Sequence, residues 1–246
     1  LPASKAREGG IAANQVFKAD IDTFVREVLQ NSLDQAIKDE DGSTHRVDAR
    51  FTLERLTGDR MRDLLDAIGW DTLFYHLEDS DLNGGETISG RLREGLELIE
   101  MDSIRVLTVE DRNTKGLTGS EDGDSNFANL CRNQLVTSSD RKESGGSFGI
   151  GKSVLWLFST LSTVLFSSRP VDREDLRFIG RTYLPSHDAF GKTWQGPGWF
   201  GAPEEDDGRP WAVSMQGEDG ETVAERCGLY RAPGEFGTSI LVLGFD

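Results

Sequence analysis

The sequence is poor in the residues that build disulfide frameworks and metal sites. Its 246 residues include only two cysteines, Cys131 and Cys227, which form no CxxC pair, and three histidines without the spacing of a ligand set. Small disulfide-stabilised folds and zinc modules need closely spaced cysteines and histidines. We therefore exclude both classes. We expect packing or surface roles for the histidines, and the reducing environment of the cytoplasm for the protein.

Long apolar runs and an excess of positive charge are also missing. No apolar run approaches the ~18 residues that a membrane span needs. The N-terminal segment LPASKAREGG lacks the apolar stretch of a signal peptide. The formal net charge is −16, and an acidic surface repels the phosphates of nucleic acids. We expect no contact with a membrane and no direct nucleic-acid binding by this domain.

What the sequence does contain is an alternation of helix and strand patterns. Helical spacing of apolar residues predicts helices over 14–38, 59–77, 90–100 and 153–161, with a shorter helical patch at 125–135. Alternation and short apolar runs predict strands over 46–56, 103–110, 162–168, 176–184 and 238–245. The segment 188–212, rich in Gly, Pro and Trp, is expected to be a loop held by aromatic packing, or else a partner-binding surface. No linker divides the chain, so we expect a single α+β domain over 1–246.

Three polar side chains share one face of the first predicted helix. Glu27, Asn31 and Asp34 are four and three residues apart, which places them together on a helix surface. They lie beside an apolar stripe that we assign to Val28, Leu29 and Leu33. An Asn carbonyl suits Mg²⁺, and a neighbouring Glu can hold and deprotonate an attacking water. The alternative is an ordinary solvated helix face.

Two further segments place polar groups at the ends of predicted strands. In DRNTKGLTG, Asp111 follows a strand directly, Asn113 tolerates the left-handed backbone region, and Gly116 and Gly119 let the backbone approach a ligand closely. In GEFGTSILVLGF, the hydroxyl of Thr238 stands at the start of a strand, where it can bond a ligand. The alternatives are a turn that caps one strand and a hydroxyl that satisfies the end of the other.

The string GGSFGIGKS over 145–153 opens a predicted helix and is rich in glycine. Its free backbone N–H groups, the helix N-terminus behind them and Lys152 favour phosphate binding. The alternatives are a plain glycine-rich loop and a P-loop, because residues 146–153 also satisfy GxxxxGK[ST]. A P-loop follows a hydrophobic strand, whereas TSSDRKESG over 137–145 has no strand pattern. That alternative also leaves Glu27 and Asp111 without a role.

In this order, the four segments resemble the motif set of the GHKL ATPases, the fold of gyrase B, heat-shock chaperone ATPases, histidine kinases, MutL and MORC proteins. EVLQNSLDQA is similar to the N-box ExxxNxxDA, with Gln35 inserted before Ala36. DRNTKGLTG resembles the box DxGxG, GSFGIGKS the box GxxGxGxxS, and GEFGTSI the closing GT element. The resemblance covers about residues 14–245. It departs from the family pattern at Asn113, where the family has Gly, and at Gly116, which comes one residue late.

The resemblance implies the Bergerat architecture, a two-layer sandwich of a mixed β-sheet and helices with a mobile ATP lid. The lid corresponds to about 112–148, and the helical segment over about 57–102 looks like an insertion. The implied roles are a catalytic general base for Glu27, a Mg²⁺ ligand for Asn31, and the contact with the adenine amino group for Asp111. Asp34 and Thr238 support the adenine side. The implied cofactor-binding residues are Asn31, Asp34, Asp111, Asn113, Gly116, Leu117, Asn129, Lys142, Gly146, Ser147, Phe148, Gly149, Ile150, Gly151, Lys152, Ser153 and Thr238.

The function implied by the resemblance is an ATP-binding, Mg²⁺-dependent ATPase whose lid closure gates dimerisation. SSDRKESGGSFGIGKS is most similar to MutL or MORC, families in which a second domain follows and supplies a lysine to the γ-phosphate. We therefore expect the chain, which starts at Leu1 rather than Met, to be the N-terminal part of a larger protein with weak activity of its own. That protein would act in DNA maintenance, in defence against foreign DNA, or on client proteins. Two alternatives stay open: a non-hydrolysing regulatory or scaffold module, and a protein kinase of the histidine-kinase type.

Overall fold

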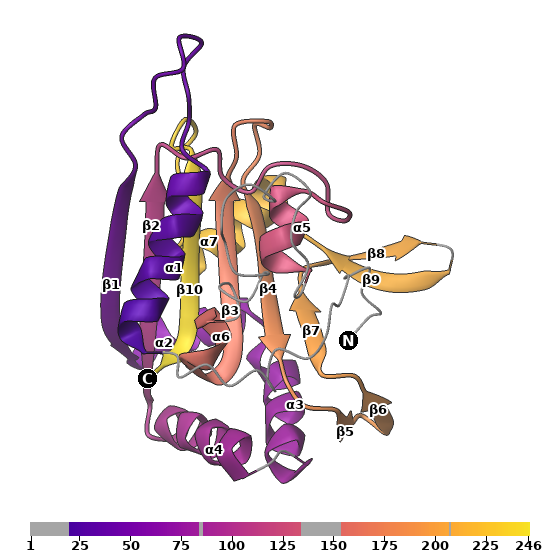
Figure 1. Ribbon diagram of the computed structural model, residues 1–246. Coiled ribbons are helices and arrows are strands. Elements are labelled where there is room, and N and C mark those ends of the chain that lie inside the picture. Colours follow the sequence, from indigo (N-terminus) through magenta and orange to yellow (C-terminus); the bar gives the residue numbers. More distant parts are fainter. Residues whose placement is uncertain (1–19, 84–85, 134–153, 207) are drawn as a thin grey trace.

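The computed structural model describes residues 20–83, 86–133, 154–206 and 208–246 (Figure 1). Its centre is a six-stranded sheet with the strand order β1-β2-β10-β3-β4-β7. The strands are β1 (Asp48–Thr57), β2 (Ser103–Arg112), β10 (Gly237–Phe245), β3 (Ser159–Arg169), β4 (Arg177–Tyr183) and β7 (Pro197–Phe200). The predicted strands 46–56, 103–110, 162–168, 176–184 and 238–245 are thereby confirmed, with ends that differ by at most three residues.

All neighbouring strands of this sheet run antiparallel, so the predicted mixed sheet is wrong. A parallel neighbour requires a crossover that carries the chain back to the edge where the first strand began. The helices between β1 and β2 make no such crossover. The chain leaves the sheet at Thr57 and returns at its direct partner Ser103.

Helices cover both faces of the sheet, which makes three layers instead of the predicted two. One face carries α1 (Ile21–Asp34), α5 (Asn126–Cys131) and α6 (Val154–Leu157). The other face carries α2 (Gly58–Ala67), α3 (Trp70–Asn83), α4 (Glu86–Glu100) and α7 (Gly217–Arg226). The reason is that central strands have apolar side chains on both sides. On β10, Leu241 and Leu243 belong to one core cluster, and Val242 belongs to the other.

The first helix is shorter than its apolar pattern indicates. Residues 14–19 lie outside the described residues, and the side chain of Asp20 caps the helix by accepting a hydrogen bond from Thr23 N at 2.7 Å. The helix ends at Asp34 instead of residue 38, because Ala36 forms a β-bridge with Thr114. The buried line of α1 is Phe24, Val28 and Ser32.

The apolar stripe that we assigned to α1 is therefore partly wrong. Leu33 is 59% exposed, because a residue nine positions after Phe24 points to the opposite side of a helix with ~3.6 residues per turn. Leu29 is only half-buried.

Three other predicted elements also differ from the structure. The helix predicted over 59–77 is divided at Gly69, which has a positive φ of 68°. Of the helix predicted over 153–161, the described part is helical only over α6, because Ser159 already pairs with Phe245 as part of β3. The helical patch over 125–135 is confirmed as the shorter α5, whereas α7 has no counterpart among the predicted elements.

The segment 188–212 is not a loop. It contains β7 and parts of two hairpins, formed by β5 (His187–Ala189) with β6 (Lys192–Trp194) and by β8 (Ala202–Asp206) with β9 (Arg209–Val213). These strands are only three to five residues long, and glycine and proline interrupt their apolar alternation. The sequence pattern therefore does not indicate them. The expected aromatic packing is present, since Trp199 and Trp211 are buried.

The cysteines are free thiols in the core, and the histidines occupy surface or packing positions. Cys131 and Cys227 are free and buried, and burial raises the pKa of each thiol to about 12. His45 contacts Asp39 on the surface, whereas His76 and His187 form a buried pair. Within the described ranges, no helix combines the length and the apolar character that crossing a bilayer requires.

Candidate functional site

The end of β2 and the start of β10 bring two predicted site residues together. Oδ1 of Asp111 accepts one hydrogen bond from the backbone N–H of Thr238 and another from the hydroxyl of Thr114, both at 2.7 Å. No described residue donates to Oδ2, and the side chain is half-buried. One carboxylate oxygen is therefore fixed by the protein, and the other can accept a hydrogen bond from a ligand.

The C-terminal end of α1 lies against the same segment. The backbone N–H of Lys115 donates to the carbonyl of Gln35 at 2.7 Å, and that of Ile37 donates to the carbonyl of Asn113 at 3.2 Å. The side chain of Gln35, the residue after the last residue of α1, accepts a hydrogen bond from Asn126 Nδ2 at 2.7 Å. The helix with the polar face is thus joined to the segment that follows Asp111.

Asn113, two residues after Asp111, lies in the left-handed backbone region that its residue type tolerates. This residue adopts a positive φ of 61° and donates from Nδ2 to the carbonyl of Arg46 at 2.9 Å. Asparagine is one of the few residues other than glycine that tolerate this region. It therefore adopts, without steric conflict, a backbone conformation that is more typical of glycine.

The two glycines of this segment approach the protein itself rather than an open ligand surface. A Cβ on Gly116 would lie 2.7 Å from Oγ of Ser168 and 3.0 Å from Cα of Pro170, and a Cβ on Gly119 would lie 2.6 Å from Cβ of Ser125. The expected close approach is therefore real, but the neighbours are β3, the residue after it and the start of α5. Leu117, which follows Gly116, is only 6% exposed and belongs to the core beneath α1.

Ser168 is a further member of the site that the sequence motifs do not include. Its hydroxyl accepts from the N–H of Leu117 at 2.9 Å and donates to the carbonyl of Gly237 at 2.8 Å. It also lies 3.3 Å from the hydroxyl of Thr238. This completely buried serine therefore joins β3, β10 and the glycine-containing segment.

The polar face of α1 is only partly turned to the protein. Glu27 and Asn31 are half-buried next to the buried line of the helix, whereas Asp34 is exposed and accepts from Gln30 Nε2 at 2.8 Å. α1 crosses the sheet in front of β2 and β10 (Figure 1). The ring of Phe24, one turn before Glu27, lies 5.1 Å from the ring of Phe158. The N-terminal half of α1 is thus close to the residues that follow α6.

Several predicted site residues cannot be placed in this arrangement. Lys142 and the glycine-rich residues 146–153 lie outside the described residues. Asn129 lies on α5, where Nδ2 donates to Asp124 at 2.8 Å and Oδ1 accepts from Asn133 at 3.0 Å. No hydrogen bond between described residues connects Asn129 to Asp111.

Arg231 contributes to the site from the loop before β10, and no local pattern signals it. The side chain is 2% exposed, and Nη2 donates to the backbone carbonyl of Asp111 at 2.6 Å. Burial lowers the pKa of Arg231, and the negative charge of Asp111 opposes that effect. Sequence reasoning misses this residue because its partner is 120 positions away.

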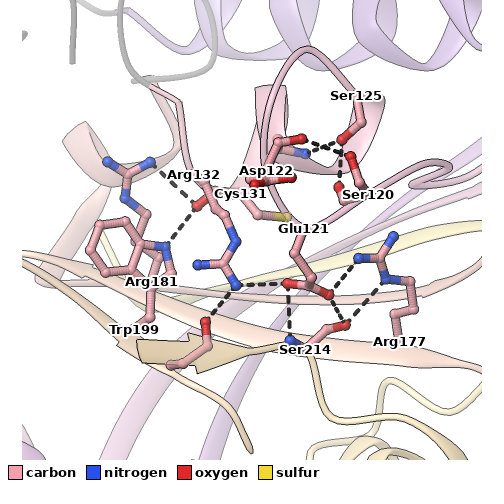
Figure 2. A network of polar contacts seen from close by, with 12 residues as sticks. Ser120, Glu121, Asp122, Ser125, Cys131, Arg132, Arg177, Arg181, Trp199 and Ser214 are labelled. Atoms are coloured by element: carbon pink, nitrogen blue, oxygen red, sulfur yellow. Dashed lines mark hydrogen bonds and ion pairs between the residues drawn. The ribbon is translucent and has the colours of Figure 1, made fainter. Parts of the chain in front are cut away.

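A second polar cluster surrounds Glu121, which lies in the segment between β2 and α5 (Figure 2). The carboxylate accepts from Arg132 at 2.7 Å and from Arg177 at 2.6 Å, and the side chains of both arginines are 1% exposed. It also accepts from the backbone N–H of Ser214 at 3.1 Å. Burial opposes ionisation of Glu121, but the hydrogen bonds from Ser214 and Arg132 and the charge of Arg177 outweigh it and lower the pKa.

This cluster changes the interpretation of the predicted lid over 112–148. Arg177 also donates to the carbonyls of Leu117 and Gly119, at 3.1 and 2.8 Å. Arg132 donates to the carbonyl of Ala212 on β9. The described part of the predicted lid, which ends at Asn133, is therefore packed against β4 and β9.

The donors around α1 are compatible with a magnesium ion bound together with a phosphate ligand. Mg²⁺ usually takes one or two protein oxygens and fills its other positions with water and phosphate oxygens. The half-buried amide of Asn31, one helical turn after Glu27, would supply such an oxygen. Among the residues that the structure describes, no group of three or more His, Cys, Asp or Glu side chains is arranged to hold a metal ion by itself.

Comparison with known proteins does not place the chain in a family. No protein-family model matches the sequence, and a search of curated proteins finds no significant match.

Proposed function

We propose that the chain is an ATP-binding and ATP-hydrolysing module of the GHKL type, with ATP bound between α1 and the segment that starts at Asp111. The observation that carries the proposal is the convergence of three motif segments. The end of α1 bridges the segment after Asp111, and the N–H of Thr238 donates to the carboxylate of Asp111. Three chance motif matches would have no reason to be in contact with one another in the fold.

The direction of α1 supports an orientation for the nucleotide. The C-terminal end of this helix meets the segment next to Asp111, and its N-terminal half lies near Phe158. The adenine ring would lie at Asp111, and the phosphates would extend towards the glycine-rich string that precedes α6. Glu27 and Asn31, which precede Asp34 on α1, would then lie on the phosphate side of the base, where the γ-phosphorus is attacked.

The proposed reaction uses Glu27 as a general base. The carboxylate takes a proton from a water molecule as the water oxygen attacks the γ-phosphorus. The bond from that phosphorus to the β,γ-bridging oxygen breaks, and ADP and phosphate leave. Mg²⁺, held by Asn31 and the phosphates, would neutralise charge on the phosphate oxygens.

The gating role follows from a difference in affinity. If ATP binds a closed, self-associated state more tightly than an open one, it shifts the population towards that state. Hydrolysis then releases the closed state. Sedimentation with and without a non-hydrolysable ATP analogue tests this part, and a monomer under both conditions would contradict it.

The decisive experiment combines binding and turnover. Titration with a non-hydrolysable ATP analogue measures binding, and a phosphate-release assay measures hydrolysis, for the wild type, Glu27→Ala and the surface control Glu40→Ala. We expect Glu27→Ala to bind the analogue but to lose turnover by about 100-fold or more, and Glu40→Ala to behave like the wild type. A wild type that binds no ATP would refute the proposal, and full turnover by Glu27→Ala would remove the general-base role.

Other outcomes identify the competing functions. Binding without phosphate release by the wild type would indicate a regulatory or scaffold module. Transfer of labelled phosphate to protein would indicate a kinase. Loss of binding in Lys152→Ala together with intact binding in Asp111→Asn would indicate a P-loop enzyme.

A further inference from the structure

A buried arginine outside the sequence motifs stands directly behind Asp111. The guanidinium of Arg231 donates three hydrogen bonds besides the one to the Asp111 carbonyl. Its other acceptors are the carbonyl of Glu235 at 3.1 Å, the carbonyl of Phe236 at 3.3 Å and the hydroxyl of Ser239 at 2.9 Å.

These contacts tie two separate segments together. A buried guanidinium is costly unless its N–H groups are hydrogen-bonded. All the acceptors of Arg231 belong either to the end of β2 or to residues 235–239, at the turn that leads into β10. The arginine therefore fixes the distance between Asp111 and the backbone of Thr238.

Gly237 makes the approach possible. It has a positive φ of 143°, and a Cβ at this position would lie 2.5 Å from Nη2 of Arg231 and 2.8 Å from Oδ1 of Asp111. Only a residue without a side chain allows the guanidinium, the carboxylate and the N–H of Thr238 to meet here.

The consequence is a carboxylate with a defined orientation. Thr238 and Thr114 occupy Oδ1, so Oδ2 is the oxygen left for a ligand. We propose that Arg231 is a positioning residue for base recognition, which holds Asp111 so that this oxygen accepts from the exocyclic amino group of a bound purine. This inference rests on the proposed ATP site and adds a residue on which its base selectivity depends.

The test compares ATP with inosine triphosphate, which has an oxygen in place of the amino group. Calorimetric titration of the full chain gives the dissociation constant (Kd) of each nucleotide, for non-hydrolysing Glu27→Ala protein with and without Arg231→Lys. We expect the parent to prefer ATP by about tenfold or more, the value of a hydrogen bond to a charged group. Lysine has three donors and no planar fork. Arg231→Lys should therefore reduce the preference to about twofold and leave the affinity for inosine triphosphate nearly unchanged.

Two further variants separate positioning from a general effect on folding. Arg226→Lys removes an arginine of α7 that pairs with Asp63 at 2.9 Å, and it should keep the full preference. Ser239→Ala removes a single acceptor of Arg231 and should lower the preference by an intermediate factor. It serves as the test if Arg231→Lys does not fold.

The outcomes distinguish this inference from the function on which it rests. Folded Arg231→Lys protein, or Ser239→Ala protein in its place, that keeps the full preference for ATP would overturn the positioning role alone. An equal loss of affinity for both nucleotides would also overturn it, because a merely structural role has that effect. A parent protein that binds neither nucleotide would overturn the proposed function and this inference with it.

Discussion

The backbone N–H of Thr238 donates a hydrogen bond to Oδ1 of Asp111 over 2.7 Å, although 127 residues separate the two in the chain. The bond joins the last residues of β2 to the first residues of β10, which are neighbours in the sheet. Because the hydroxyl of Thr114 donates to the same oxygen, the carboxylate has little rotational freedom. A rigid acceptor of this kind discriminates between ligands better than a mobile one.

Asp111→Asn should weaken ATP binding by about 10- to 100-fold, the effect of losing a hydrogen bond to a charged acceptor. The amide oxygen of the asparagine can still accept from Thr238 and Thr114, so the fold should persist. Its NH₂ group then faces the amino group of the base, donor against donor. Titration with a non-hydrolysable ATP analogue measures the effect, with exposed Asp71→Asn on α3 as the control. If Asp111→Asn and Asp71→Asn bound the ATP analogue with equal affinity, Asp111 would not be a contact of the nucleotide.

Gly116→Ala should destabilise the fold more than Gly42→Ala does. Both glycines have a positive φ, 68° and 84°, which costs a residue with a side chain about 1–2 kcal/mol. A Cβ on Gly42 meets nothing within 4 Å, whereas one on Gly116 meets Ser168 and the backbone of Pro170. Overpacking of this kind adds about 1–3 kcal/mol. Urea unfolding of both variants measures the difference, and equal losses would show that Gly116 is not constrained by its neighbours.

Most of the central strands could be predicted from the sequence because they are buried on both faces. The runs SIRVLTVE and GTSILVLGF, which form most of β2 and all of β10, are rich in apolar residues because both of their faces are buried. The short hairpins β5–β6 and β8–β9 could not be predicted, because strands of three to five residues contain too few alternations. The end of α1 was equally hidden, because it depends on the bridge from Ala36 to Thr114, a distant residue.

The residues of the candidate site also differ in whether local sequence or distant partners determine their role. The residue type of Asn113 indicated a tolerance for the left-handed conformation, which the structure shows it to adopt. Arg231, Ser168 and Glu121 could not be found, because each has at least one partner that lies between 51 and 120 residues away. A sequence motif describes neighbours along the chain, and these three residues matter only through neighbours in space.

Glu121→Gln should lower the free energy of unfolding at pH 7 by about 3 kcal/mol. Removing the carboxylate leaves Arg132 and Arg177 buried without their counter-charge, the situation in which broken buried pairs cost about 3–5 kcal/mol. The exposed pair of Arg60 and Glu54, 3.5 Å apart, offers the control Glu54→Gln, for which a change below about 1 kcal/mol is expected. Urea unfolding at pH 7 provides the comparison.

The same variant should respond differently to acid. The pKa of Glu121 is lower in the folded protein than in the unfolded chain, so the unfolded chain binds the proton first as pH falls. The contribution of Glu121 is therefore complete above the unfolded value of about 4.3 and declines as pH falls through the folded pKa. The stability gap between the wild type and Glu121→Gln should narrow below about pH 4. A gap that stays constant down to the acid transition would contradict the lowered pKa.

The buried pair of His76 and His187 should make the stability of the fold depend on pH in a range above that of Glu121. Nδ1 of His76 lies 2.7 Å from Nε2 of His187, whose Nδ1 contacts the carbonyl of Pro185 at 2.8 Å. If His187 donates to that carbonyl, its Nε2 is an acceptor and His76 Nδ1 carries the proton. Burial, and then the charge of His187, lower the pKa of His76 to about 4, although Asp79 acts in the opposite direction.

Protonation of His76 therefore opposes folding. Between about pH 6.5 and about pH 4 the unfolded chain is protonated at this residue and the folded protein is not, so stability falls as pH falls through this window. The loss approaches roughly 3 kcal/mol at its lower end. Urea unfolding from pH 7 to pH 4 should show this slope in the wild type and lose it in His76→Gln, whose amide can still donate to His187. Because the chain has only three histidines, a proton NMR titration can follow His76 directly. A midpoint near the ordinary histidine value would show that the folded protein accommodates the charge.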